Sequence, residues 1–172
     1  MRSEDAALLD ALTALASVVG MDVPPDAVDD DEHGRWPLYD EALRRPEANP
    51  VLLRLVGLEP NEGIAVSIVL QMVEAVDEAE QDRWVWALPA DRRGFARWRA
   101  REVGIARRVA GEGVGPDELD VEQWSDWLQR RVARDGGQLA VLDALAVDGR
   151  SRRVRAQAAE HARRARKRLS SL

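Results

Sequence analysis

Apolar residues recur at helical spacing along almost the whole chain, and this periodicity restricts the fold more than any other feature. Near the N-terminus, Leu8, Leu12, Leu15 and Val19 form one stripe on a helix. Residues 64–73 are apolar at nearly every position, which is typical of a helix buried on all sides. No stretch shows the sustained alternation of apolar and polar residues that a strand needs. The sequence therefore predicts an all-α fold with residues 64–73 at the centre of its core.

Prolines, glycines and capping residues divide this pattern into about seven to eight helices, stacked irregularly. Ser3, Asn61 and Asp91 are expected to cap helices, and Asp120 with Gln123 resembles a capping box. The segment 83–88 is interpreted as a helix end or a short helix. The other expected helices cover residues 4–19, 38–45, 51–58, 62–73, 92–110, 120–134, 138–147 and 151–169. The segment 20–36, which contains two adjacent prolines and an acidic run, is expected to be a mobile acidic loop.

The length of 172 residues predicts a single domain, 1–172, that can bury a proper core. The chain has no cysteine, which excludes disulfides, thiolate metal sites and cysteine nucleophiles. The acidic start does not resemble a signal peptide, and the longest apolar run, 64–76, is too short to cross a bilayer about 30 Å thick. The excess of arginine, alanine and valine indicates a bacterial genome, so we expect a bacterial cytoplasmic protein.

Charge is distributed unevenly along the chain. Residues 1–34 hold nine acids and one base, a net charge of −8. Residues 150–168 hold nine bases and one acid, a net charge of +8. Such an asymmetry steers charged partners, or it makes the two ends of the chain attract each other.

The stretch LAVLDALAVDGRSRRVRAQAAEHARRA, residues 139–165, combines a leucine-bearing segment, a turn at Asp148 and an alanine-rich segment that opens with Val154 and Arg155. This arrangement resembles a HEAT-type helical repeat, although the pattern weakens in the rest of the chain. The resemblance implies a short HEAT-like α-α superhelix, a class of fold whose members mostly bind proteins and in some cases nucleic acids. It implies no particular activity.

Residues that carry chemistry are scarce, and none of them forms a catalytic pattern. His33 follows the consecutive acids Asp29, Asp30 and Asp31, but these acids lack the alternate spacing of a calcium loop, so we interpret the run as a solvated acidic loop. His161 lies beside the apolar stripe of the last helix, where a boundary position is the simpler interpretation. The sequence thus predicts no catalytic residue, no metal site and no cofactor.

Six tryptophans and two arginine-rich segments remain as candidate contact residues. Trp98, Trp124 and Trp127 lie on apolar stripes and are expected in the core, whereas Trp36, beside a loop proline, is the candidate for an exposed protein contact. The arginine-rich helices 92–108 and 150–168 suggest contacts with phosphates, or a solvated face paired with internal acids. On the first of these interpretations the nucleic-acid contacts are Arg97, Arg101, Arg153, Arg155, Arg163 and Arg166.

Three functional hypotheses follow. The preferred one is a non-enzymatic interaction module that binds another protein. The alternative is a nucleic-acid-binding protein that uses the two arginine-rich helices. The third is an enzyme or small-ligand binder in which Glu62 and Glu74, at the ends of the buried helix, have perturbed pKa values.

Overall fold

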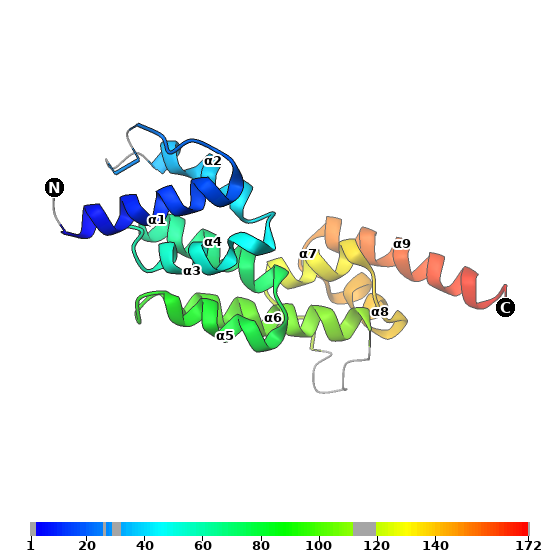
Figure 1. Ribbon diagram of the computed structural model, residues 1–172. Coiled ribbons are helices and arrows are strands. Elements are labelled where there is room, and N and C mark those ends of the chain that lie inside the picture. The colour runs from blue at the N-terminus through cyan, green and yellow to red at the C-terminus, as the bar shows by residue number, and fades with distance from the viewer. Residues whose placement is uncertain (1–2, 26, 29–31, 112–119, 172) are drawn as a thin grey trace. The chain divides into compact units, whose positions relative to one another are not determined.

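The computed structural model describes residues 3–25, 27–28, 32–111 and 120–171 (Figure 1). Every regular element within these ranges is a helix, which confirms the all-α fold class. The helices in chain order are α1 (Ser3–Val19), α2 (Glu32–Ala42), the 3-10 helix η1 (Pro46–Ala48), α3 (Asn49–Val56), α4 (Glu62–Ala75), α5 (Glu78–Ala87), α6 (Arg93–Ala110), α7 (Asp126–Asp135), α8 (Leu139–Asp148) and α9 (Arg152–Leu169).

The chain divides into two compact units, residues 1–100 and 101–172, where its length predicted a single domain. Each unit has its own cluster of buried apolar side chains. The boundary falls inside α6, so the helical pattern of the sequence continues through it without a break. A linker rich in glycine or proline, which is the usual sequence sign of a boundary, is therefore missing at this point.

The core of the first unit is formed largely by the stripes that the periodicity indicated. Leu12 and Leu15 of α1 are completely buried, as are Ile68 and Val69 of α4. Asn61 caps α4 as expected, because its side-chain oxygen accepts hydrogen bonds from the first backbone amides of the helix. The prediction that α4 lies within a core is confirmed.

The helix α2 begins earlier than predicted. The sequence placed residues 20–36 in a loop and began a helix after Pro37, but α2 starts at Glu32 and contains Pro37. A proline inside a helix removes one backbone hydrogen bond. The structure offsets this loss through Arg35, which lies on α2, is fully buried, and binds the carboxylate of Glu59.

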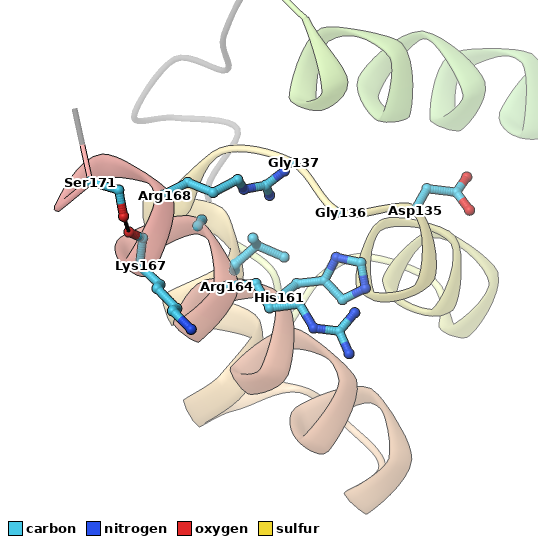
Figure 2. A pocket seen from close by; sticks show the side chains of 10 residues that line it. Asp135, Gly136, Gly137, His161, Arg164, Lys167, Arg168 and Ser171 are labelled. Carbon is cyan, nitrogen blue, oxygen red and sulfur yellow. Dashed lines mark hydrogen bonds between the residues drawn. The ribbon is translucent and has the colours of Figure 1, made fainter.

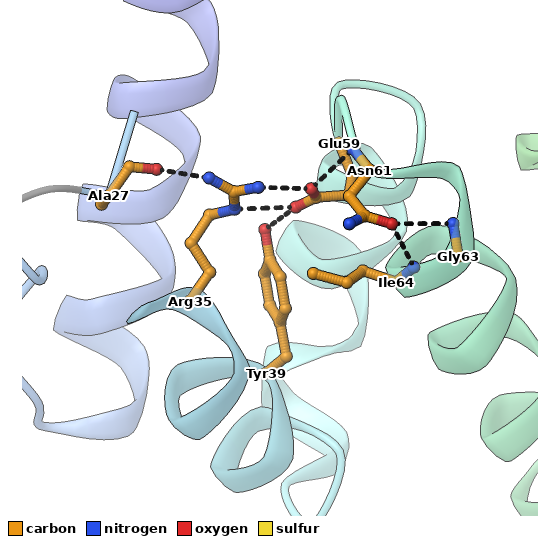
Figure 3. A network of polar contacts seen from close by, with 7 residues as sticks. All are labelled: Ala27, Arg35, Tyr39, Glu59, Asn61, Gly63 and Ile64. Atoms are coloured by element: carbon orange, nitrogen blue, oxygen red, sulfur yellow. Dashed lines mark hydrogen bonds and ion pairs between the residues drawn. The ribbon is translucent and has the colours of Figure 1, made fainter. Parts of the chain in front are cut away.

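Glu59 is the centre of a buried polar network (Figure 3). The Arg35 guanidinium donates to both carboxylate oxygens, with Nη2 2.8 Å from Oε1 and Nε 3.1 Å from Oε2. Tyr39 donates its hydroxyl to Oε2 at 2.5 Å, and the backbone amide of Asn61 donates to Oε1 at 3.0 Å. The remaining Arg35 nitrogen, Nη1, donates to the carbonyl of Ala27 at 2.9 Å. Three segments that are distant in the sequence are thereby joined around one carboxylate.

A buried glutamine performs the same task in each unit. Gln81 of α5 donates to the carbonyl of Val73, at 2.7 Å, and Gln129 of α7 donates to the carbonyl of Val121, at 2.6 Å. In both cases the acceptor lies eight residues earlier, so the glutamine closes the turn that leads into its own helix. The Gln129 side-chain oxygen also accepts from the backbone amide of Arg150, which fixes the turn before α9.

The helix α7 begins later than predicted. Asp120 and Gln123 do interact, because Nε2 of Gln123 donates to Oδ2 of Asp120 at 2.7 Å. They close a turn, however, and do not open a helix. The cap is Ser125, whose hydroxyl accepts from the Leu128 amide and whose own amide donates to the buried Glu102. The burial of Val121 fixes the chain in this turn and delays the helix.

The helices α8 and α9 form the predicted hairpin. Ser151 caps α9, and the leucines of α8 pack against the small residues of α9. Gly149 is required between them, because a Cβ there would lie 2.5 Å from the Leu145 carbonyl oxygen and 2.8 Å from Val154 Cγ1. The Arg155 guanidinium donates to the Gly149 carbonyl and closes the turn.

Removing Arg35 should destabilise the first unit strongly. The substitution Arg35→Met leaves Glu59 buried without its counter-charge, so we expect a loss of about 3–5 kcal/mol in the free energy of unfolding, measured with urea at neutral pH. The control is Arg44→Met, which breaks exposed ion pairs with Asp40 and Glu41 and should cost at most about 1 kcal/mol. Equal losses for the two variants would contradict this account.

Tyr39 should resist ionisation in the folded protein. Burial, and then the negative charge of Glu59, raises its pKa well above the ordinary value. Tyr39 is the only tyrosine, so tyrosinate absorbance reports on it directly. The unfolded chain in urea should ionise near pH about 10, and the native protein only at higher pH. Because the folded-state pKa is raised, this group stabilises the fold at lower pH and loses that contribution as the pH rises past its unfolded pKa. Identical titrations in both states would contradict the buried site.

Candidate functional site

Three large aromatic side chains are exposed on α5 and α6 of the first unit. Trp86, near the end of α5, is 57% exposed, and Phe95 and Trp98 of α6 are 48% and 50% exposed. Phe95 and Trp98 contact each other edge to face, with ring centroids 6.1 Å apart. Exposed aromatic side chains that contact each other, as Phe95 and Trp98 do, are typical of a contact surface.

Arginines of α6 lie over two of these three rings. The guanidinium carbons of Arg93 and Arg97 lie 4.4 Å and 5.0 Å from the centroid of the Trp86 ring, and that of Arg99 lies 5.6 Å from the centroid of Phe95. These distances are those of cation–π contacts. We use the name aromatic surface for the set of Trp86, Phe95, Trp98, Arg93 and Arg97, which comprises two groups: the Phe95–Trp98 pair, and Trp86 with its two arginines.

The geometry of α6 explains why its aromatic residues are exposed. Ala96 is completely buried and Ala100 packs partly against the core, so the small residues form the inner face of the helix. Successive helical residues are rotated by about 100°, which turns Phe95 and Trp98 away from the face that contains Ala96. The prediction that Trp98 lies in the core is therefore wrong, because alanine and not tryptophan fills the inner face.

The charges beside the aromatic surface are only partly neutralised. Arg92 forms an ion pair with Glu62, and Nη1 of Arg99 lies 3.5 Å from Oε1 of Glu74. Arg97 has no acidic partner among the described residues, so its positive charge remains next to Trp86. Glu62 is half exposed, Glu74 is partly exposed, and each is paired with an arginine, so this pair does not form the buried carboxylate site of the third hypothesis.

The other tryptophans lie in or beside the two cores. Trp84 and Trp124 are buried, and Trp127 packs partly against the second cluster, in line with the expectation for Trp124 and Trp127. Trp36, the predicted protein contact, is partly buried and packs against the first cluster. Its packing against this cluster explains its position.

The arginines predicted to bind nucleic acid are divided between the two units. Arg97 lies in the first unit and stacks on Trp86. In the second unit, Arg163 pairs with Glu160 and Arg166 pairs with Asp143 at 2.6 Å, while Arg155 donates to the backbone of its own turn. Arg101 and Arg153 are exposed. Within the ranges described, half of the six candidates thus serve contacts inside the second unit.

The acids Asp29, Asp30 and Asp31 lie outside the described residues, and the side chain of His33 is not described either. Among the residues that are described, no group of three or more histidine or acidic side chains is arranged to hold a metal ion. Within the same ranges, no helix has both the length and the apolar character needed to span a membrane.

Comparison of the chain with protein-family models, with curated proteins and with solved structures found no match. The aromatic surface therefore has to be interpreted from its own geometry.

The spacing of two tryptophans on α5 indicates in the sequence that one of them is exposed. Trp84 and Trp86 are two residues apart on one helix, which places them about 200° apart around its axis. Only one of them can face the core, and the structure buries Trp84. A buried Trp84 therefore requires an exposed Trp86.

Collisional quenching of tryptophan fluorescence should reveal the charge of the aromatic surface. Because Arg93 and Arg97 cover Trp86, we expect iodide to quench the exposed tryptophans more strongly than caesium does. The double substitution Trp86→Phe and Trp98→Phe should remove most of the iodide-sensitive fluorescence. Trp84→Phe, which replaces a buried ring, is the control and should leave that fraction nearly unchanged. Stronger quenching by caesium would contradict the cationic surface.

Proposed function

We propose that this chain is a non-enzymatic interaction module of a bacterial cytoplasm, and that it binds another protein through the aromatic surface on α5 and α6. The observation that carries the proposal is the exposure of Trp86, Phe95 and Trp98, each about half open to solvent, with arginines over the rings of Trp86 and Phe95. Exposing three such rings costs solvation free energy in the isolated chain, and a partner that covers them recovers it.

The composition of the surface favours a protein partner. Tryptophan and arginine are the residues most enriched among those that dominate protein–protein binding energy. Of the two arginines stacked on Trp86, Arg93 is held in place before binding, because it also donates hydrogen bonds to the carbonyls of Leu88 and Trp86. A surface that is ordered in advance loses less conformational entropy when it binds.

The charge of the surface indicates the chemistry of the partner. Arg97 keeps its positive charge next to Trp86, with no acidic partner among the described side chains. A matching segment therefore carries apolar side chains for the rings and at least one carboxylate for Arg97. The resemblance of α8 and α9 to a HEAT-type repeat supports the same class of function, since that family mostly binds proteins.

The test compares variants in quantitative affinity purification from a bacterial lysate treated with nuclease. We expect at least one protein to be retained by the wild type and lost, by about tenfold or more, with Trp86→Ala and Trp98→Ala combined. The matched control is Val147→Ala, which shortens a side chain that is 74% exposed on α8. Circular dichroism of all variants checks that their helix content is unchanged.

Two results would overturn the proposal. The first is a set of retained proteins that is the same for the wild type and the double variant. The second is that proteins retained from an untreated lysate are all lost when the lysate is treated with nuclease, which would favour the nucleic-acid hypothesis. An additional variant, Arg97→Glu, should weaken retention if the partner supplies a carboxylate.

A further inference from the structure

The second unit contains an open pocket of about 940 Å³ that the proposed function does not use (Figure 2). Its walls come from the turn between α7 and α8, from α8 and from the last turns of α9. The lining includes Gly136, Gly137, Leu142, His161, Lys167 and Arg168. Pockets of this volume commonly bind small organic ligands.

Basic groups outnumber acidic groups on the pocket lining. Arg164, Lys167 and Arg168 contribute cationic side chains, and His161 adds two ring nitrogens. Asp135 is the single acid on the lining, and it forms ion pairs with Arg131 and Arg134, which lie outside the lining. Figure 2 shows the Asp135 carboxylate pointing away from the His161 ring. The pocket therefore favours an anion.

Several donors in the pocket are available to a ligand. Arg164 is engaged by Glu160 at 2.8 Å. The side chains of His161, Lys167 and Arg168 have no hydrogen-bond or ion-pair partner among the described residues, although Arg166, on the same helix, has one in Asp143. Figure 2 shows Arg168 extending towards Gly137 while the His161 ring lies beside Gly136. These groups approach the turn from α9.

The turn is shaped to bring His161 close to the backbone. Gly136 has a φ of 83°, and a Cβ at this position would lie 2.8 Å from His161 Nδ1. A Cβ at Gly137 would lie 2.5 Å from Val109 Cγ1. Both glycines are therefore needed to keep the turn packed while the imidazole stays at the pocket wall.

We propose that this pocket binds a small organic phosphate, with the phosphate held by Lys167, Arg168 and His161 and the body of the ligand against Leu142 and Ala165. Phosphate fits because it carries two or more charges and several acceptor oxygens for the basic donors that line the pocket. The apolar wall and the concave shape favour a small molecule over a polymer that would lie along the outside of α9. The inference is independent of the aromatic surface, which belongs to the first unit.

The test is a titration followed by NMR of the histidine side chains. The chain has two histidines, so His161→Gln assigns the His161 signals, and those of His33 serve as the reference. ADP is the probe for an organic phosphate, pyrophosphate for the phosphate alone and adenosine for the body alone. We expect saturable movement of the His161 signals with ADP, smaller movement with pyrophosphate and none with adenosine.

Paired variants separate a built site from a general attraction between charges. Lys167→Ala with Arg168→Ala should raise the dissociation constant for ADP by about tenfold, because it removes two charged donors from the pocket. The matched control is Arg152→Ala with Arg153→Ala, which removes the same charge from exposed positions at the other end of α9 and should change the constant less than about twofold.

Three outcomes would overturn the proposal. One is the absence of His161 movement with ADP up to about 10 mM, well above the range of ordinary small-ligand affinity. Another is equal weakening by the two double variants, which would mean that basic residues near the end of α9 merely complement the helix dipole and attract anions generally. The third is movement with adenosine equal to that with ADP, since the phosphate would then contribute nothing.

Discussion

The first unit depends on the hydrogen bonds and the ion pair that the buried carboxylate of Glu59 forms. A charge in a protein interior is tolerated only with partners, and Glu59 obtains them from Arg35, Tyr39 and the amide of Asn61. Meeting this requirement draws α2 towards the turn before α4 and holds the carbonyl of Ala27 as well. The start of α2 at Glu32, ahead of Pro37, follows from the same contact. The need of the buried Glu59 carboxylate for partners, and not helix propensity, thus decides where α2 begins.

Small residues decide what the sixth helix presents to solvent. With Ala96 on the inner face of α6, the helix leaves Phe95 and Trp98 outside and lets Arg97 reach Trp86 of α5. An apolar residue on a helix is not automatically a core residue, because a few alanines can satisfy the buried face. The large rings then become available for contacts with another molecule.

The two units also differ in charge. Residues 1–100 contain 20 acids and 10 bases, whereas residues 101–172 contain 11 acids and 15 bases. The aromatic surface is thus a local positive region in an acidic unit, and the pocket beside His161 is a positive site in a basic unit. Each site is consistent with a ligand that carries negative charge, but they differ in shape. We propose the first, an exposed surface, as a contact for a partner chain, and the second, which is concave, as a site for a small molecule.

The sequence by itself determined most of the helices and of their ends, the burial of α4 and the hairpin of α8 and α9, since these follow from apolar periodicity and from caps such as Asn61. It predicted only the second half of α5, as a helix end or short helix over 83–88. Only the tertiary structure decided the early start of α2, the late start of α7, the division inside α6 and the exposure of Trp98. The physical reason is that these depend on contacts between residues distant in the sequence, such as Arg35 with Glu59 and Ser125 with Glu102. Periodicity shows which residues share a helix face, but the neighbours of that face determine whether it is buried.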